Sequence, residues 1–288
     1  MVLGWLSGFV PYLNLILPSP TAVLIYRHGV AAGLLSWAVA VLLVGLLMGN
    51  LPGAVLLALA GLIAVGIGEG LRRGLPPAQV LALGVLGSVL WVLGVLVGGL
   101  WLLGINSLEA TLKAMEQSMQ QAMDLYGRLG FSAEQLRQMR ESTQATLALM
   151  RRLAPAIFFL TAVATAYVNY WVVRVVLQRM GERLAWFAPF SRWRSSPVPA
   201  LAMALGLAAA FAGSRFPLAA TVGNNLFVLG WMSATVQGLS LVWFWLERQQ
   251  VSRLVRGLVL FLVLSFWPVW AATAAAGALD PWFNWRRL

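Results

Sequence analysis

Five polar side chains stand inside long apolar runs, where a polar group is costly unless it finds a hydrogen-bond partner. They are Asn169, Tyr170, Asn224, Asn225 and Gln237. An amide offers both a donor and an acceptor, so this set predicts a site that hydrogen-bonds a small polar ligand. The same amides could instead bond neighbouring helices, which is a common use of amides in apolar surroundings. Both interpretations stay open from the sequence.

The chain offers little for catalysis. It has no cysteine and a single histidine, His28, so thiolate chemistry, a cluster of metal-binding histidines and a serine–histidine–aspartate triad have almost nothing to draw on. No paired carboxylates stand in the apolar runs, and neither a His-Glu-x-x-His pattern nor a phosphate-binding Gly-x-x-x-x-Gly-Lys loop occurs. We therefore expect a protein that is not an enzyme, with no cofactor and no metal.

Composition sets the surroundings of these residues. Of the 288 residues 60% are hydrophobic and only 10% are charged, and the mean hydropathy is +0.82. Soluble domains carry about 25% charged residues, so this chain cannot cover itself with a water-soluble surface. It is expected to be an integral membrane protein in contact with the lipid bilayer. Its net charge of +11 then reflects membrane topology, and we expect no nucleic-acid partner.

Uncharged runs recur at the length of membrane helices, which need roughly 20 apolar residues. They predict an all-α polytopic bundle with eight or nine membrane segments. The runs are residues 3–26, 29–48, 54–67, 77–103, 154–173, 199–213, 218–246 and 258–276. The first run contains several prolines and could be one kinked span or a helical hairpin. The side of the membrane on which the N-terminus lies therefore stays open.

Residues 105–152 are polar, unlike the rest of the chain, and their apolar side chains recur at steps of three and four, as on one face of a helix. Asn106 with Glu109, and Ser132 with Gln135, have the spacing of capping boxes at two helix starts. We predict a water-exposed amphipathic hairpin of two helices. The apolar stripes of the two helices could pack against each other, or the hairpin could act as a lid over a pocket.

The hairpin divides the chain into two membrane halves, residues 1–104 and 153–288. Cytoplasmic loops collect arginine and lysine. The loops 27–29, 72–76, 174–196 and 247–256 together hold 11 basic residues against two acidic ones, whereas five acids offset six bases in the hairpin. We therefore place these loops in the cytoplasm and the hairpin outside. This arrangement leaves Arg286 and Arg287 outside, against the rule.

Some residues could contact a partner protein. Small residues four positions apart let helices approach closely, and mixed aromatic and basic residues suit either a partner or an anionic lipid surface. The candidates are Gly4, Gly8, Arg27, His28, Gly29, Trp186 and Trp193. Internal helix packing for the glycines, a basic turn at the membrane edge for residues 27–29 and simple lipid contact for the tryptophans are the alternatives.

Several short signatures occur in a characteristic order: Tyr26-Arg27-His28-Gly29, Arg151-Arg152-Leu153-Ala154-Pro155, Asn169-Tyr170, Ala188-Pro189-Phe190 and Val236-Gln237-Gly238-Leu239. Nearly the whole chain thereby resembles the YybS-like family of bacterial membrane proteins, which implies a membrane fold and a bacterial cytoplasmic membrane but no particular activity. More remotely, residues 1 to about 103 resemble the S components of energy-coupling-factor vitamin transporters and the rod-shape protein MreD. The S-component resemblance implies a ligand pocket near the outer face, capped by loops.

Together these patterns predict a non-enzymatic, small-ligand-binding, transport-related subunit. Because the chain has no ATP-binding loop, an energy-coupling transporter module would have to energise it. The alternative is a membrane scaffold or regulatory protein, similar to MreD, that contacts cell-envelope proteins. The sequence does not identify the ligand.

Overall fold

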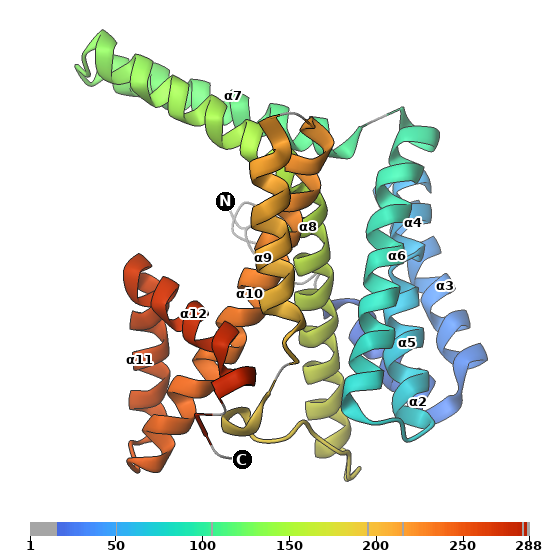
Figure 1. Ribbon diagram of the computed structural model, residues 1–288. Helices are drawn as coiled ribbons and strands as arrows, with labels where there is room; N and C mark the ends of the chain where they lie inside the picture. The colour runs from blue at the N-terminus through green and yellow to red at the C-terminus, as the bar shows by residue number, and fades with distance from the viewer. Residues whose placement is uncertain are drawn as a thin grey trace. The chain divides into compact units, whose positions relative to one another are not determined.

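The computed structural model describes residues 16–49, 51–104, 106–194, 196–214, 216–283 and 285–286. Over these residues the chain is α-helical with two short 3-10 turns, and no strand occurs in them (Figure 1). This confirms the predicted all-α class. The chain forms two compact units: Met1–Arg151 with Ile157–Trp186, the N-terminal unit, and Arg152–Ala156 with Phe187–Leu288, the C-terminal unit.

Within the described residues, five helices are long and apolar enough to cross a membrane, or up to six if a bent pair counts as one span. The five are Val30–Leu47, Ala54–Arg72, Pro77–Leu102, Ala133–Arg179 and Leu218–Arg248. A polytopic helical architecture is therefore confirmed. This count over the described residues is below the predicted eight or nine segments. Most of the predicted run 3–26 lies outside the described residues, and one apolar helix, Val198–Phe211, is too short.

The described part of the N-terminal unit begins with five helices: α2 (Pro18–His28), α3 (Val30–Met48), α4 (Leu51–Ala58), α5 (Gly61–Arg72) and α6 (Pro77–Leu103). α5 lies between α2 and α6 and packs against both. Glycine makes this approach possible, because a Cβ atom on Gly68 would lie 2.6 Å from the Ala22 carbonyl oxygen of α2. Small residues here serve internal helix packing.

The predicted run 54–67 is interrupted between α4 and α5, which was not foreseen. An interruption frees backbone carbonyls that the helix would otherwise bond. The buried Trp37 of α3 compensates, since its Nε1 donates a hydrogen bond of 2.9 Å to the Ala58 carbonyl oxygen. A side chain from a neighbouring helix therefore satisfies the end of α4.

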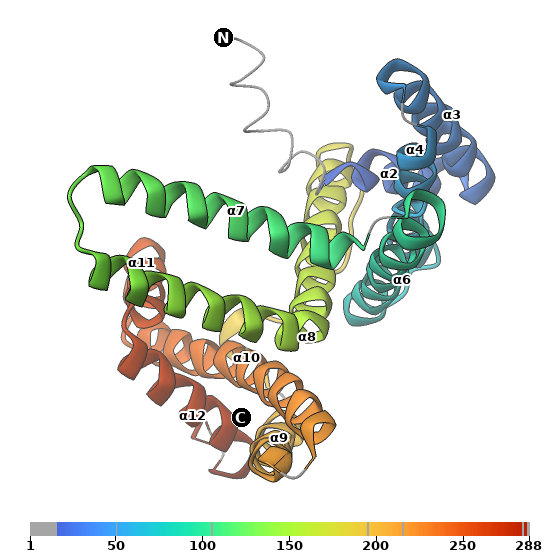
Figure 2. The same cartoon turned by 90° about the horizontal axis from the view of Figure 1, so that it is seen from above.

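The predicted hairpin is present, as α7 (Ser107–Arg128) and the first part of α8 (Ala133–Arg179), which run antiparallel in Figure 2. The Asn106 side chain accepts from the Glu109 amide at 3.2 Å, and Ser132 with Gln135 forms a complete capping box. α8 continues without a break from the hairpin into the following apolar run, for 47 residues in all. Pro155 lies inside it.

The C-terminal unit contains the turn η1 (Phe190–Arg192), α9 (Val198–Phe211), η2 (Ala212–Ser214), α10 (Pro217–Arg248), α11 (Arg253–Ser265) and α12 (Trp267–Phe283). Both α9 and α12 pack along α10. The crossing of α10 and α12 is close: a Cβ on Gly277 would lie 2.1 Å from the Ala234 carbonyl oxygen. α10 runs unbroken through Gly223, Asn224 and Asn225.

The last predicted span, residues 258–276, is wrong as a single straight helix. α11 and α12 meet at an angle of 105°. Phe266 between them has an extended backbone (φ −107°, ψ 107°). Pro268 follows in the first turn of α12, a position where proline is tolerated because its missing N–H is not needed there. The proline therefore ends one helix and starts the next.

Candidate functional site

Asn169 and Tyr170 lie on α8 in the N-terminal unit, and neither is exposed to solvent. The Asn169 Oδ1 accepts a hydrogen bond from Ser19 Oγ at 2.8 Å, and its Nδ2 donates to the Thr165 carbonyl oxygen at 2.9 Å. Tyr170 stacks on Trp186 with ring centroids 5.4 Å apart. These contacts hold α2 and the segment that follows α8 against α8, which is the helix-bonding alternative left open by the sequence.

Asn225 lies on α10 and bonds the backbone of Arg152–Ala156, a stretch of α8 that belongs to the C-terminal unit. Its Oδ1 accepts from the Ala156 N–H at 2.8 Å, and its Nδ2 donates to the carbonyl oxygens of Arg152 at 2.7 Å and of Thr221 at 2.8 Å. Ala156 N–H and Arg152 C=O are the two groups that a regular helix would join.

Pro155 explains why this backbone needs an outside partner. A proline inside a helix has no N–H and its ring crowds the carbonyl four residues earlier. The Asn225 amide gives the two neighbouring backbone groups a donor and an acceptor at this point. The adjacent Asn224 is half-buried, and its side chain has no hydrogen bond with the described residues.

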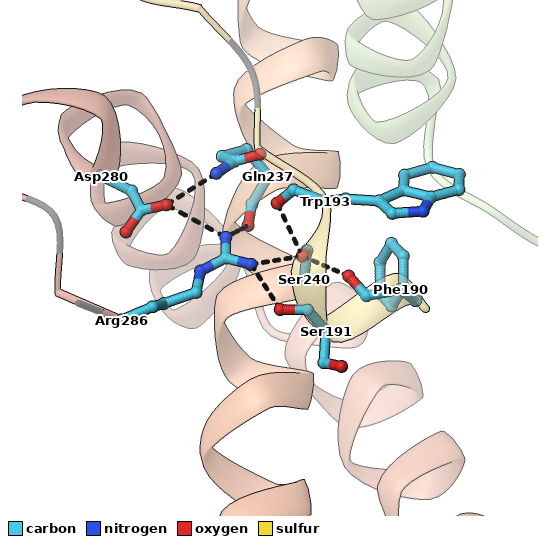
Figure 3. Close-up of polar contacts among 7 residues, drawn as sticks. All are labelled: Phe190, Ser191, Trp193, Gln237, Ser240, Asp280 and Arg286. Carbon is cyan, nitrogen blue, oxygen red and sulfur yellow. Dashed lines mark hydrogen bonds and ion pairs between the residues drawn. The ribbon is translucent and has the colours of Figure 1, made fainter. Parts of the chain in front are cut away.

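Gln237 belongs to a buried network that includes an ion pair (Figure 3). Its Nε2 donates to Asp280 Oδ2 at 2.7 Å, and the Arg286 guanidinium lies 3.0 Å from the same oxygen. Both charged side chains are buried, with exposures of 0% and 1%. Arg286 also donates to the Ser191 carbonyl oxygen at 2.7 Å and to Ser240 Oγ at 2.9 Å.

This network connects four parts of the C-terminal unit: α10, α12, η1 and the residues after α12. The Ser240 hydroxyl also bonds the Phe190 carbonyl oxygen at 2.6 Å, which fixes η1 on α10. Burial lowers the pKa of the Arg286 guanidinium, and the neighbouring Asp280 carboxylate opposes that shift. A buried ion pair is tolerated only with such extra hydrogen bonds, because removing two charges from water is costly.

Sequence reasoning did not single out Asp280, because the last predicted span ended at residue 276, and it did not expect Arg286 to be buried. The C-terminal tail was placed on the opposite side of the membrane from residues 174–196. The structure instead bonds Arg286 to Ser191, within that basic segment. A lone acid at the end of an apolar run, with an arginine six residues later, was the signal.

Most of the residues predicted to contact a partner lie in the described part of the chain. Arg27 and His28 are exposed in the last turn of α2. Gly29 is buried with φ +91°, and a Cβ there would lie 2.6 Å from Arg72 Nη1. Gly4 and Gly8 lie outside the described residues. No partner is therefore tested at these positions.

The two predicted tryptophans are both held by their own unit. Trp186 packs against Tyr170, and the Arg174 guanidinium lies 4.2 Å from its ring centroid. Trp193 donates through Nε1 to the Ala188 carbonyl oxygen at 2.8 Å. Trp186 therefore holds the segment after α8 against that helix, and Trp193 stabilises a turn within the segment.

A cavity of about 640 Å³ with a mixed polar and apolar lining lies at the base of the hairpin. It begins at Gly104, directly after α6, and opens between α7 and the hairpin part of α8. Its polar and charged lining residues are Asn106, Glu109, Lys113, Glu116, Gln144 and Arg151. Arg151 binds Glu109 through two hydrogen bonds of 3.0 and 2.8 Å, which join α7 to α8. We call this the hairpin cavity.

The hairpin cavity has the size and the chemistry of a small-molecule site. Such sites are typically about 300–1,000 Å³ with a few convergent polar groups. Lys113 and Glu116 are exposed, and neither forms an ion pair with the described residues. Within those residues, no group of three or more His, Asp or Glu side chains is placed to hold a metal ion.

A family model described as "Predicted membrane protein (DUF2232)" matches residues 1–281. No curated protein and no solved structure matches the chain. The match confirms the expected family of membrane proteins in its coarse form. The finer resemblances to YybS-like proteins, to S components and to MreD stay predictions.

Proposed function

The chain belongs to the DUF2232 family of predicted membrane proteins, and we propose that it is a non-enzymatic, small-ligand-binding subunit of a membrane transport system. The observation that carries this proposal is the hairpin cavity of about 640 Å³. Three of the amides that suggested a ligand site from the sequence, Asn169, Asn225 and Gln237, form hydrogen bonds within the fold, so the proposal rests on the cavity instead.

The position of the cavity supports a role at the membrane surface. α6 supplies the candidate span Pro77–Leu102, and the chain leaves it at Gly104, which has a positive φ of 64° and lines the cavity. The arginine distribution favours an outer location for the hairpin. A ligand pocket near the outer face and covered by loops is also what the S-component resemblance implies.

The charges of the cavity indicate the kind of ligand. Glu109 and Arg151 neutralise each other, which leaves Lys113 for an anionic group and Glu116 for a cationic group. The Gln144 amide adds both a donor and an acceptor. We propose a small polar molecule that carries both charges. Transport of such a ligand would need a partner, since the chain has no ATP-binding loop.

Binding of host metabolites tests the proposal. The full-length protein in lipid nanodiscs is incubated with a small-molecule extract of its host, washed, and the retained compounds are identified by mass spectrometry. We expect one polar compound to be retained, and at least a tenfold loss in the Lys113→Gln/Glu116→Gln variant. Removing the charges of the pocket removes the attraction for both ends of the ligand.

The matched control is Glu134→Gln/Arg137→Gln, which removes one acid and one base from an exposed pair of the same hairpin. It should retain the compound. Equal retention by all three proteins, or no retained compound, would contradict the assignment to the hairpin cavity.

The second candidate function is a membrane scaffold or regulatory protein. The observation in its favour is the hairpin itself, whose methionine stripe is partly open, with Met115 38% and Met119 37% exposed. Methionine is common on adaptable protein-binding surfaces. This function predicts that Met115→Ser/Met119→Ser loses a co-purifying cell-envelope protein, while the Lys113 and Glu116 substitutions do not.

A further inference from the structure

We propose that the N-terminal unit binds an anionic phospholipid, with the phosphate in a basic cavity at the end of α2 and an acyl chain in an apolar groove beside the same helix. This site is separate from the hairpin cavity and does not depend on the proposed function. Two neighbouring features of the unit carry the inference: the charge of the cavity and the groove that leads to it.

The basic cavity has a volume of about 400 Å³ and is lined by Tyr26, Arg27, His28, Arg72 and Glu182. Arg27 and His28 are exposed in the last turn of α2, and the Arg72 side chain is 49% exposed at the end of α5. Cavities of this kind, formed by basic residues between membrane helices, suit anionic headgroups.

The acids near this cavity leave its arginines available. Glu69 receives a hydrogen bond of 2.8 Å from Arg73, whereas its nearest contact with Arg72 is a looser 3.9 Å. Glu182 accepts a hydrogen bond of 3.1 Å from the Tyr26 hydroxyl. The cavity lining therefore holds two arginines against one carboxylate that already has a partner, so it favours an anion.

Gly29 allows this arrangement. It turns the chain from α2 into α3 with φ +91°, a conformation that residues with a Cβ atom rarely adopt. A Cβ there would lie 2.6 Å from Arg72 Nη1, so any larger residue would push the guanidinium away. The glycine lets Arg72 reach over the turn towards Arg27 and His28.

The apolar groove has a volume of about 590 Å³ and is lined by Ile16, Leu17, Ser19, Pro20, Val23, Leu24, Val172 and Val176. All but Ser19 are apolar. On α2, positions 20, 24 and 27 follow one another at helical steps of four and three, so they lie on one face of the helix. The rise from Pro20 to Arg27 is about 10 Å, so lining residues of the groove and of the basic cavity lie about two turns apart on the same face of α2.

A phospholipid is the ligand that needs both features. A free phosphate would use the arginines but not the groove, and a neutral lipid would use the groove but not the arginines. A ligand that occupies both the basic cavity and the apolar groove is therefore a lipid with a net negative charge.

Native mass spectrometry of the delipidated full-length protein tests the site with phosphatidylglycerol and phosphatidylcholine as probes. We expect one phosphatidylglycerol to bind at least tenfold more tightly than phosphatidylcholine. Arg27→Gln/Arg72→Gln should abolish this preference. The matched control Arg248→Gln/Arg253→Gln removes two positive charges from the C-terminal unit and should keep it.

Two further arms separate the sources of the phosphate and the role of the groove. Leu24→Trp fills the groove and should weaken phosphatidylglycerol binding, while soluble glycerol phosphate should not compete with the lipid. Competition by glycerol phosphate would replace the lipid site with a free-anion site. Equal binding of both lipids, or an unchanged preference in Arg27→Gln/Arg72→Gln, would overturn the proposal. Unchanged phosphatidylglycerol binding in Leu24→Trp would overturn the assignment of the acyl chain to the groove.

Discussion

Asn225 illustrates how a polar residue in an apolar run can be structural. Its amide bonds the Ala156 N–H and the Arg152 carbonyl oxygen on either side of Pro155. Residue type alone could not distinguish this role from ligand binding, because both need an amide. The distinction depends on a residue 70 positions away in the sequence, Pro155, and on which helix faces it.

The first prediction concerns this amide. Asn225→Leu leaves two backbone groups beside Pro155 without their partner, and an unsatisfied buried group costs about 1–3 kcal/mol. We expect a clearly lower thermal unfolding temperature in detergent, followed by tryptophan fluorescence, with retained metabolites unchanged. Asn224→Leu is the control, because its side chain has no hydrogen bond with the described residues, and it should change stability little. An equal loss in both variants would contradict this role.

The second prediction concerns the buried ion pair. Asp280→Asn or Arg286→Gln alone leaves an uncompensated buried charge, which typically costs about 3–5 kcal/mol. The double variant removes both charges and should be less destabilised than the sum of the single variants. A double-mutant cycle of unfolding free energies measures the coupling. Additive effects would show that the two side chains act independently.

At the scale of helices, the sequence predicted those helix ends that depend only on residues close together in the chain. Ser132 and Gln135 predicted the start of α8 because a capping box needs only four neighbouring residues. The end of α4 was missed because its carbonyl is satisfied by Trp37, from another helix. The bend before α12 was missed although Pro268 marks it, because the run of apolar residues continues through the proline.

The third prediction concerns the crossing of α10 and α12. A Cβ on Gly238 would lie 2.0 Å from the Thr273 carbonyl oxygen, and backbone cannot yield as a flexible side chain can. Gly238→Ala should therefore lower the unfolding temperature strongly or prevent folding. Gly257→Ala on α11 is the control, since no atom lies within 4 Å of its added Cβ. It should be neutral or slightly stabilising, because alanine favours helix by about 1 kcal/mol over glycine.

The fourth prediction concerns pH and the contact between α2 and the segment after α8. Burial raises the pKa of Tyr26 above its ordinary value of 10.0. The hydrogen bond to Glu182 and the negative charge of that carboxylate raise it further. The folded state thus holds the phenol proton more tightly than the unfolded state. The stability that results is complete below pH 10.0 and is lost as the pH rises through the folded-state pKa.

Unfolding temperatures of the wild type and of Tyr26→Phe, measured across this pH range, test the contact. The wild type should lose more stability than the variant, which has no phenol to titrate. Parallel curves would show that Tyr26 contributes nothing to the pH dependence.

At the scale of the whole molecule, composition predicted the membrane class and the helical architecture, because both follow from the summed hydropathy of long runs. The proposed ligand site could not be predicted in this way, since the hairpin cavity arises only where α7 and α8 come together. Lys113 and Glu116 looked like an ordinary solvent-exposed helix face in the sequence. Their function becomes a specific proposal only through the cavity that they line.

The fifth prediction concerns topology. The chain has no cysteine, so single cysteines can be placed at will. Ser118→Cys lies on an exposed part of the hairpin and Gln249→Cys in an exposed turn after α10. A membrane-impermeant maleimide added to intact cells should label Ser118→Cys, while Gln249→Cys should react only after the membrane is opened. The reverse pattern would invert the orientation and place the hairpin cavity in the cytoplasm.

The most direct measurement for the central claim is native mass spectrometry of the wild-type protein released gently from its own host's membranes. A ligand-binding transport subunit should carry one small polar molecule in stoichiometric amount, either alone or together with energising subunits. A protein that emerges with lipids only, or with cell-envelope proteins and no small polar molecule, would contradict the transport role and favour the scaffold.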